Sequence, residues 1–205
     1  MVYQWYTMPS PRFWRLPVDR RAHILSVARR HIAVAGPEAA SYNQIIADAG
    51  ISKTSAYLYF DGKDDLVAEV QRDVMQRIAD MLGTWRAARS ARGFFAQLGE
   101  SAERLQQHLA EHLDDLGVLG AAGSMPQPYV DNSDPWLDAM LEDGRRLGVV
   151  RSDIAPALMA AATRALLQVG DAFAIAALRR GDTPELAPLW SLLRGLWGTP
   201  TKERR

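Results

Sequence analysis

The chain has 205 residues, enough for one ordinary domain or two small ones with a buried core. Its 24 Lys and Arg residues balance 24 Asp and Glu residues, which excludes a protein that coats polyanions through general positive charge. The absence of cysteine excludes disulfide scaffolds, thiolate zinc sites and a cysteine nucleophile. No stretch reaches the ~18–20 uninterrupted apolar residues of a membrane span, and the N-terminus lacks the pattern of a secretory signal.

The balanced total charge hides an uneven distribution. Residues 1–60 hold seven basic and three acidic residues, a sum of +4. Residues 94–144 hold ten acidic residues and one basic residue, a sum of −9. A positive end joined to a negative middle indicates two separate tasks in one chain.

Helical periodicity runs through nearly the whole chain, and no alternating apolar pattern bounded by hairpin dipeptides indicates a strand. The first helix is predicted over residues 18–34, because an apolar stripe runs along it and Gly36 ends it. The second helix follows a capping box formed by Ser41 and Gln44. Gly50 stops this helix and permits the sharp turn that follows.

Ser52 is expected to cap a third short helix, residues 53–60. Asp61 and Asp64 form a capping-type pair that predicts a fourth helix over residues 62–82. The apolar face expected to be buried on this helix is Leu66, Val70, Val74, Ile78 and Met81.

The rest of the chain continues as helices, giving an all-α fold of about nine helices. Residues 122–134 are rich in turn formers and predict a loop. Asp153 and the pair Thr183-Pro184 are expected to open the last two helices. The predicted later helices are residues 92–112, 113–121, 135–148, 153–180 and 184–197.

The second and third helices, joined by a tight turn over residues 49–52, predict a helix-turn-helix. In such a motif the later helix fits the major groove of DNA while the earlier one crosses the backbone. Lysine can donate to guanine, hydroxyls can donate or accept, and helix N-termini bind phosphate. The residues expected to contact DNA are Ser41, Tyr42, Lys53, Thr54, Ser55, Tyr57, Tyr59 and Lys63. The alternative is that they are ordinary helix-surface residues, whereas Ala56 and Phe60 are expected in the core.

With these residues in place, the sequence resembles a known family. Residues 20–70, RRAHILSVARRHIAVAGPEAASYNQIIADAGISKTSAYLYFDGKDDLVAEV, are similar to the DNA-binding domain of the tetracycline-repressor (TetR/AcrR) family of bacterial regulators. The resemblance covers about a quarter of the chain. The matching positions are Ile24-Leu25 with Ala28, Gly36, Ile45 to Ser52, Tyr57, Tyr59-Phe60, Lys63 and Leu66.

The resemblance implies a ligand-responsive regulator, most often a homodimeric repressor that a small molecule releases from a palindromic operator. It implies an N-terminal extension (1–17), a three-helix DNA-binding domain (18–64), a ligand-binding and dimerisation domain (65–200) and a polar tail (201–205). Ligand binding would move the fourth helix and so change the spacing of the two recognition helices. Independently, the wide apolar faces of residues 154–180 and 184–197 exceed what a monomer of this size buries, which favours a homodimer.

The middle of the chain is expected to enclose the effector, although most of its large side chains are ordinary core residues. The candidate pocket residues are Trp85, Phe95, His112, Tyr129, Trp136, Met140, Arg164 and Gln168. The acidic excess favours a cationic ligand, or is a solvated face that repels DNA. His108 and His112 share a helical face, as a metal half-site or, more commonly, as surface or pocket histidines.

The role of the N-terminal segment is open to more than one interpretation. The aromatic and basic N-terminal segment is either an arm whose Arg12 and Arg15 enter a minor groove, or, more commonly, a flexible extension, or the product of an upstream start codon with Met8 as the natural start. No nucleophile elbow, phosphate loop or metalloprotease motif is present, so we expect no enzyme, cofactor or metal site. The sequence therefore predicts a cytoplasmic DNA-binding regulator; the alternative is a helical ligand- or protein-binding module that no longer reads DNA.

Overall fold

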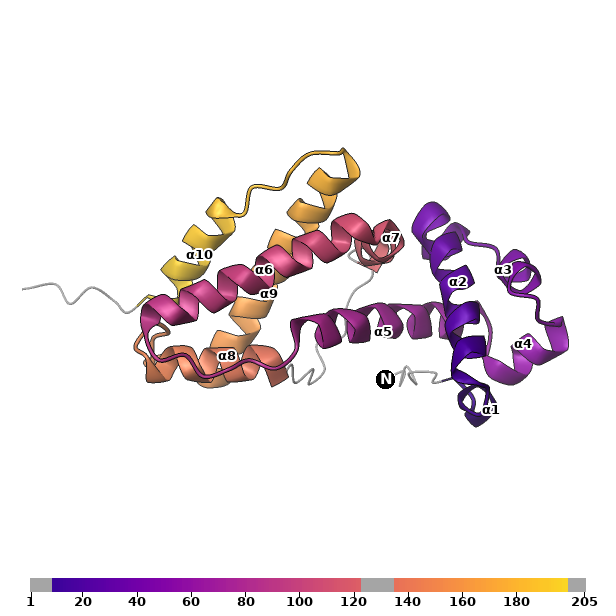
Figure 1. Ribbon diagram of the computed structural model, residues 1–205, viewed down its shortest axis with the longest axis horizontal. Coiled ribbons are helices and arrows are strands. Elements are labelled where there is room, and N and C mark those ends of the chain that lie inside the picture. Colours follow the sequence, from indigo (N-terminus) through magenta and orange to yellow (C-terminus); the bar gives the residue numbers. More distant parts are fainter. Residues whose placement is uncertain (1–8, 123–134, 199–205) are drawn as a thin grey trace, which may run out of the picture. The chain divides into compact units, whose positions relative to one another are not determined.

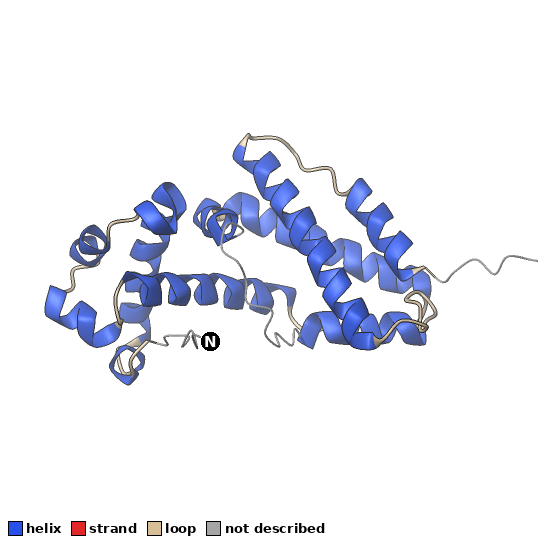
Figure 2. Ribbon diagram, turned by 180° about the vertical axis from the view of Figure 1, so that it is seen from behind, coloured by secondary structure: helices blue, strands red, loops and turns tan. Residues whose placement is uncertain are grey.

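The computed structural model describes residues 9–122 and 135–198, and within them it contains only helices and connecting segments (Figures 1 and 2). These residues group into two compact units. Unit 1 holds residues up to Asp80 together with those from His108, and unit 2 holds Met81–Gln107 together with residues 135–198. The helices are α1 (Pro11–Trp14), α2 (Val18–Ala39), α3 (Tyr42–Asp48), α4 (Lys53–Tyr59), α5 (Lys63–Leu82), α6 (Ala91–Glu111), α7 (Leu113–Ala122), α8 (Pro135–Arg146), α9 (Pro156–Arg179) and α10 (Ala187–Trp197).

Unit 1 is built around α2, whose predicted apolar stripe is buried. Gly36 has a φ of 80°, outside the helical region, so the regular helix breaks there as predicted and one further turn follows. Ser41 caps α3 by accepting a hydrogen bond from the Gln44 amide at 3.4 Å, and Gly50 takes a φ of 62° in the turn. These local signals confirm the predicted boundaries of the helix-turn-helix.

The start of α5 corrects one detail of the prediction. The amide of Asp61 donates to Oδ2 of Asp65 at 3.0 Å, so Asp65, and not Asp64, forms the pair across the first turn. Asp65 is buried while Asp64 is exposed. For this reason Asp64, although closer to Asp61 in the sequence, is not the residue that accepts the hydrogen bond from the Asp61 amide. On the predicted apolar face, Leu66, Val70, Val74 and Ile78 are buried and Met81 is half-buried.

A network of charges is buried where α2, α5 and α7 meet the end of α6. The Asp115 carboxylate is almost fully covered, accepts hydrogen bonds from Arg77 and from Nε2 of His108 at 3.1 Å, and forms an ion pair with Arg29, whose Nε lies 3.3 Å away. Arg29 also reaches Asp73 at 3.2 Å. A buried carboxylate needs such partners, because an unpaired charge in the interior is strongly destabilising.

Unit 2 has its own apolar core between α6, α8, α9 and α10. Its largest members that are almost fully covered are Phe94, Leu137, Met140, Leu141, Met159 and Trp197. The indole of Trp197 satisfies its buried N–H by donating to Oγ1 of Thr163 at 2.9 Å. The core therefore joins the C-terminal helix to the long α9 through one buried hydrogen bond as well as through packing.

Two helix starts in unit 2 differ from the prediction. The long helix α9 begins at Pro156 because Asp153 is engaged elsewhere: its carboxylate pairs with Arg151, with Nη2 and Oδ2 2.6 Å apart. The helix α10 begins at Ala187, with Pro188 in its first turn in place of the predicted Pro184. In each case a proline still occupies the first turn, where its missing N–H leaves no hydrogen bond unmade.

Residues 9–17 differ from the flexible extension expected of them, and residues 1–8 lie outside the described residues. Ser10 caps a short helix, α1, by accepting from the Arg12 amide at 3.3 Å, and Phe13 at its centre is fully buried. The sequence carried this signal, because a serine followed by proline commonly opens a helix.

The helix α9 is apolar over a length that would cross a membrane, and few of its residues are buried. Length and composition alone are weak evidence for a span. Along the helix, Leu158, Ala162, Ala165, Val169, Ala172 and Ala176 recur at alternating intervals of four and three residues. This spacing places them on one stripe, the pattern by which helices pack side by side.

We predict that Gly117→Ala destabilises unit 1. The helices α2 and α7 make the most extensive contact between elements of this unit. A Cβ at residue 117 would lie 2.5 Å from the Cβ and 2.7 Å from the Cα of Ala33, so backbone would have to move. We expect a loss of about 1–3 kcal/mol in the free energy of unfolding, measured by urea denaturation.

The matched control is Gly99→Ala on α6, where a Cβ would meet nothing within 4 Å. Alanine favours a helix interior over glycine, so this variant should gain up to ~1 kcal/mol. Equal effects of the two substitutions would contradict the close approach of α2 and α7.

Candidate nucleic-acid interface

The helix α4 presents its first turn to solvent. Ser52 caps it by accepting from the Ser55 amide at 3.0 Å, which fixes the direction in which the helix starts. Lys53 and Thr54 in this turn are exposed, and Tyr57, one turn on, is 56% exposed. An ammonium, a hydroxyl and a phenol on one exposed edge are groups that contact bases and phosphates.

The opposite side of α4 anchors it to the unit. Ala56 and Phe60 are buried, as the sequence predicted, and they pack in the unit whose core includes Ile45 and Ile46 of α3. The turn between the two helices is held from outside, because Nη2 of Arg20 donates to the Gly50 carbonyl at 2.7 Å. The exposed edge is therefore carried on a fixed support.

Three members of the predicted set also have partners within the protein. The Ser55 hydroxyl accepts from the Ser52 hydroxyl at 2.9 Å. The ring of Tyr59 lies 6.3 Å from that of Phe13, and Nζ of Lys63 donates to the Glu38 carbonyl at 2.5 Å. These interactions position the side chains around α4, and Lys63 ties the start of α5 to the end of α2.

Tyr42 has a supporting place beside the exposed edge. Its ring packs edge-on against Tyr57, with centroids 5.7 Å apart, and its hydroxyl is covered and has no hydrogen-bond partner among the described residues. Burial, with smaller contributions from Tyr57 and Asp65, raises the pKa of Tyr42 to about 12, so the hydroxyl stays protonated. Ser41, before it, is exposed while its hydroxyl caps α3.

The structure places the described members of the predicted pocket in different parts of the two units. Trp85 and Met140 are buried in the core, and Phe95 packs against it with the Arg194 guanidinium 5.0 Å from its ring. Arg164 and Gln168 lie on α9, His112 belongs to unit 1, and Tyr129 lies outside the described residues.

A groove of about 330 Å³ lies instead between the end of α5, the segment after it, α6 and α8. Of the predicted residues only Trp136 lines it. Its polar wall includes Thr84, Arg86, Gln97, Glu100 and Arg104. Among the described residues, neither arginine has a carboxylate within 4.0 Å, although Arg104 donates to the Ser101 hydroxyl at 3.1 Å.

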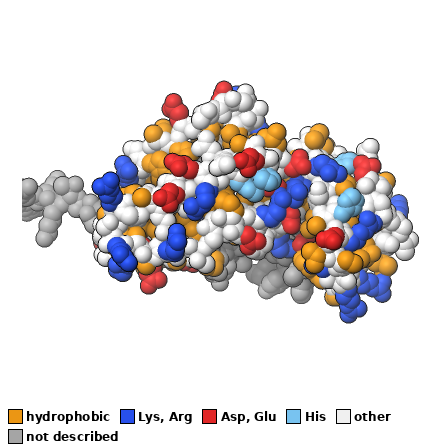
Figure 3. Space-filling model, viewed as in Figure 1, with side chains coloured by type: hydrophobic (Ala, Val, Ile, Leu, Met, Phe, Trp, Pro, Cys, Tyr) orange, Lys and Arg blue, Asp and Glu red, His pale blue; other side chains and the backbone are white. Residues whose placement is uncertain are grey.

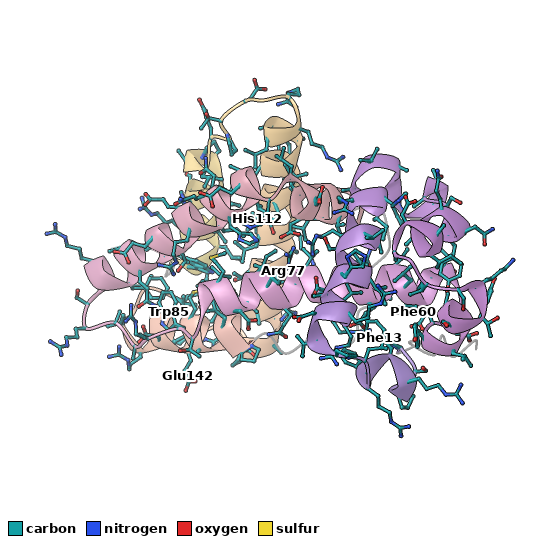
Figure 4. The ribbon with its side chains drawn as sticks, turned by 45° about the vertical axis from the view of Figure 1, so that its right-hand side comes forward. Phe13, Phe60, Arg77, Trp85, His112 and Glu142 are labelled. Carbon is teal, nitrogen blue, oxygen red and sulfur yellow. The ribbon has the colours of Figure 1, made fainter. Side chains whose placement is uncertain are left out.

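A buried carboxylate fixes the segment that forms one wall of this groove. Asp143 accepts from Nε1 of Trp85 at 3.0 Å, from the Ala88 amide at 2.8 Å and from Nε of Arg146 at 3.1 Å. Burial alone would raise the pKa of Asp143, but these hydrogen bonds and the nearby guanidinium outweigh it and lower the pKa. Trp85, labelled in Figure 4, packs against Phe94 of α6 and Trp136 of α8, with ring centroids 5.2 and 5.3 Å away.

The two histidines that shared a helical face in the sequence are stacked, with centroids 4.3 Å apart. His108 bonds to Asp115, and Nδ1 of His112 lies 2.9 Å from the His108 carbonyl. Within the described residues, no group of three or more potential ligands could hold a metal ion. His108 therefore belongs to the buried charge network of unit 1, and the exposed His112 stacks against it.

Comparison with known proteins relates the segment that holds α3 and α4 to a known family. Residues 24–70 match the family model described as bacterial regulatory proteins, tetR family. No curated protein matches the chain.

Solved structures share the fold along nearly the whole chain. A TetR family transcriptional regulator from Chloroflexus aurantiacus J-10-FL is 20% identical, with 92% of this chain and 93% of that chain covered and a TM-score of 0.54. A TetR-family transcriptional regulator from Haemophilus influenzae Rd is 19% identical, with 87% and 94% covered and a TM-score of 0.60.

A third structure, described as the molecular basis for control of antibiotic production by bacterial hormones, is 20% identical over 89% of this chain and 97% of that chain, with a TM-score of 0.56. At these identities the likeness is one of fold. The family model adds the identity of the segment that holds α3 and α4. Residues 24–70, which include α3 and α4, are therefore similar to the tetR family of bacterial regulatory proteins, and the chain as a whole shares the fold of solved TetR-family regulators.

Proposed function

We propose that this chain is a cytoplasmic, homodimeric repressor that binds a palindromic DNA operator and is released from it by a small molecule. The observation that carries the proposal is the exposed edge of α4, with Lys53, Thr54 and Tyr57 presented from a capped and buried support. A helix entering the major groove needs polar side chains at its exposed start and a rigid attachment behind them. The regulator fold of the solved relatives supports the same conclusion.

We predict that the protein enriches a palindromic duplex from a pool of random-sequence DNA. Replacing Lys53 and Tyr57 together by alanine should lower affinity for that duplex at least about 30-fold, since two base or phosphate contacts of roughly 1–3 kcal/mol each sum to about 2–6 kcal/mol. Affinity is measured by fluorescence anisotropy over a range of salt concentrations. Arg92→Ala, an exposed arginine on α6, is the control and should leave affinity unchanged.

A failure to enrich any duplex, even at low salt, would contradict the operator proposal. It would favour the alternative of a helical binding module that does not read DNA. Retained helical circular dichroism in the double variant separates lost contacts from lost folding.

The second protomer is proposed to cover α9 and α10. Leu158, Val169, Phe173 and Leu192 are large apolar residues that are more than half exposed, with Phe173 77% exposed. A soluble chain seldom leaves such a patch open. A membrane fits this surface poorly, because Arg164, Gln168 and Asp171 lie in the middle of the same helix, where charged side chains are costly in hydrocarbon.

We predict that Val169→Asp converts a dimer into a monomer, because it places a charge in the apolar stripe of α9. Light scattering coupled to size exclusion should give about twice 22.7 kDa for the unaltered chain and about 22.7 kDa for the variant. Met75→Asp, at an equally exposed position on α5, should remain dimeric. A monomeric unaltered chain at ~100 µM would contradict the proposal.

The effector is proposed to bind the groove of unit 2. Its volume is at the lower end of the range typical of small-molecule sites. The lining of the groove includes two arginines, Arg86 and Arg104, and one glutamate, Glu100. It therefore carries a net positive charge, despite the acidic excess of residues 94–144. Guanidinium groups without a protein carboxylate favour a ligand that carries a carboxylate, with Trp136 supplying an aromatic surface.

We predict that aromatic carboxylic acids raise the melting temperature of the protein and that their matching amides do not. Arg104→Ala should weaken this binding about tenfold or more, because it removes a charge-assisted hydrogen bond. Arg89→Ala, exposed on the neighbouring segment but outside the groove, is the control. Equal responses to acids and amides would contradict an anionic effector.

A further inference from the structure

The helix α1 lies outside the residues matched by the family model, which begin at residue 24. It is nevertheless attached to the recognition helix. The fully buried Phe13 ring lies 4.8 Å from that of Phe60, at the C-terminal end of α4 (Figure 4). The aromatic contact makes α1 part of the core that supports α4.

Hydrogen bonds fix both ends of α1. The Ser10 amide donates to the Tyr59 carbonyl at 2.8 Å, and the Ser10 hydroxyl donates to the Leu58 carbonyl, so its start is tied to α4. At its other end, Nη1 of Arg21 donates to the carbonyls of Trp14 at 2.8 Å and Leu16 at 2.7 Å. A helix of four residues has no stability of its own, so these contacts hold it in place.

Two arginines of this segment make no ion pair with the described residues. Arg12 and Arg15 are exposed, and neither has a carboxylate within 4.0 Å among the described residues. By contrast, Arg20 and Arg21 bind backbone carbonyls, and Arg29 pairs with the buried carboxylate of Asp115 and with Asp73. Figure 3 shows basic side chains gathered at the lower edge of unit 1, where Figure 1 places α1.

We propose that α1 is an added part of the DNA-binding surface, in which Arg12 and Arg15 bind backbone phosphates beside the groove entered by α4. The inference rests on the proposed DNA-binding function and extends it to residues that precede the family segment. Contacts to phosphates fix the position of a protein on DNA without reading the base sequence. Arg12 and Arg15, attached to the C-terminal end of α4, are placed for this kind of contact. Phe13 is the positioning residue, since it holds both arginines against α4.

The test uses the full chain and the duplex that it enriches from random DNA. Each neutralised phosphate contributes about 0.9 to the slope of log affinity against log salt. Replacing Arg12 and Arg15 by alanine should therefore reduce that slope by about 2 for each bound protomer. Affinity near physiological salt should fall at least tenfold, while the order of preference among sequence variants of the duplex stays the same.

Matched variants separate this role from general charge and from folding. Arg89→Ala with Arg92→Ala removes two exposed arginines at the same three-residue spacing in unit 2 and should leave the slope unchanged. Arg12→Lys combined with Arg15→Lys should retain the slope of log affinity against log salt, because phosphate binding needs the positive charge of these side chains. Phe13→Ala should lose the same slope as the double alanine variant, provided that its circular dichroism remains helical.

The outcomes distinguish this inference from the function on which it rests. If a duplex is enriched and the Arg12 and Arg15 variant keeps the full slope, or matches the control, the inference is overturned and the operator proposal stands. A changed order of sequence preference would also overturn it, because the arginines would then read bases. If no duplex is enriched, both proposals fail.

Discussion

The helix α4, proposed to enter the DNA groove, has only seven residues and is not stable as a helix on its own, and this constraint governs unit 1. Isolated helices in water need about twice that length before they are even marginally stable. The unit therefore supplies from outside what α4 lacks. Ser52 caps its start, Ala56 and Phe60 bury its inner side, and Arg20 pins the turn before it. The docked Phe13 closes the far end, so both ends of the helix are held.

Each unit uses a buried carboxylate to join segments that are distant in sequence. Asp115 gathers Arg29, Arg77 and His108 in unit 1, and Asp143 gathers Trp85, Ala88 and Arg146 in unit 2. A buried anion is tolerated only where its donors converge, so each site specifies one arrangement of its partners. In unit 2 this arrangement shapes a wall of the groove, which connects stability to the proposed effector site.

The tasks proposed for the two units follow from the distribution of their charged and apolar side chains. In the described part of unit 1, Arg20, Arg21 and Arg29 bind groups of the protein, whereas Lys53 at the start of α4 and Arg12 and Arg15 at α1 have no carboxylate within 4.0 Å. On unit 2, Arg86 and Arg104 face a groove, while α9 keeps an apolar stripe open to solvent. The net charge of zero is therefore the sum of unlike surfaces. The edge formed by α4 and α1 suits DNA, the groove of unit 2 suits a small anion, and the exposed face of α9 and α10 suits a second protomer.

The sequence by itself determined the all-helical class, the helix-turn-helix and most helix ends, because caps and positive-φ glycines act within about four residues along the chain. Ser52, Gly36 and Gly50 are such signals, and the structure confirms them. Only the tertiary structure decided which side chains remain free. Lys63 meets a carbonyl 25 residues away and Trp85 a carboxylate 58 residues away, and no local pattern encodes such partners. The groove and the docking of α1 arise for the same reason: burial depends on elements that meet only when the chain has folded.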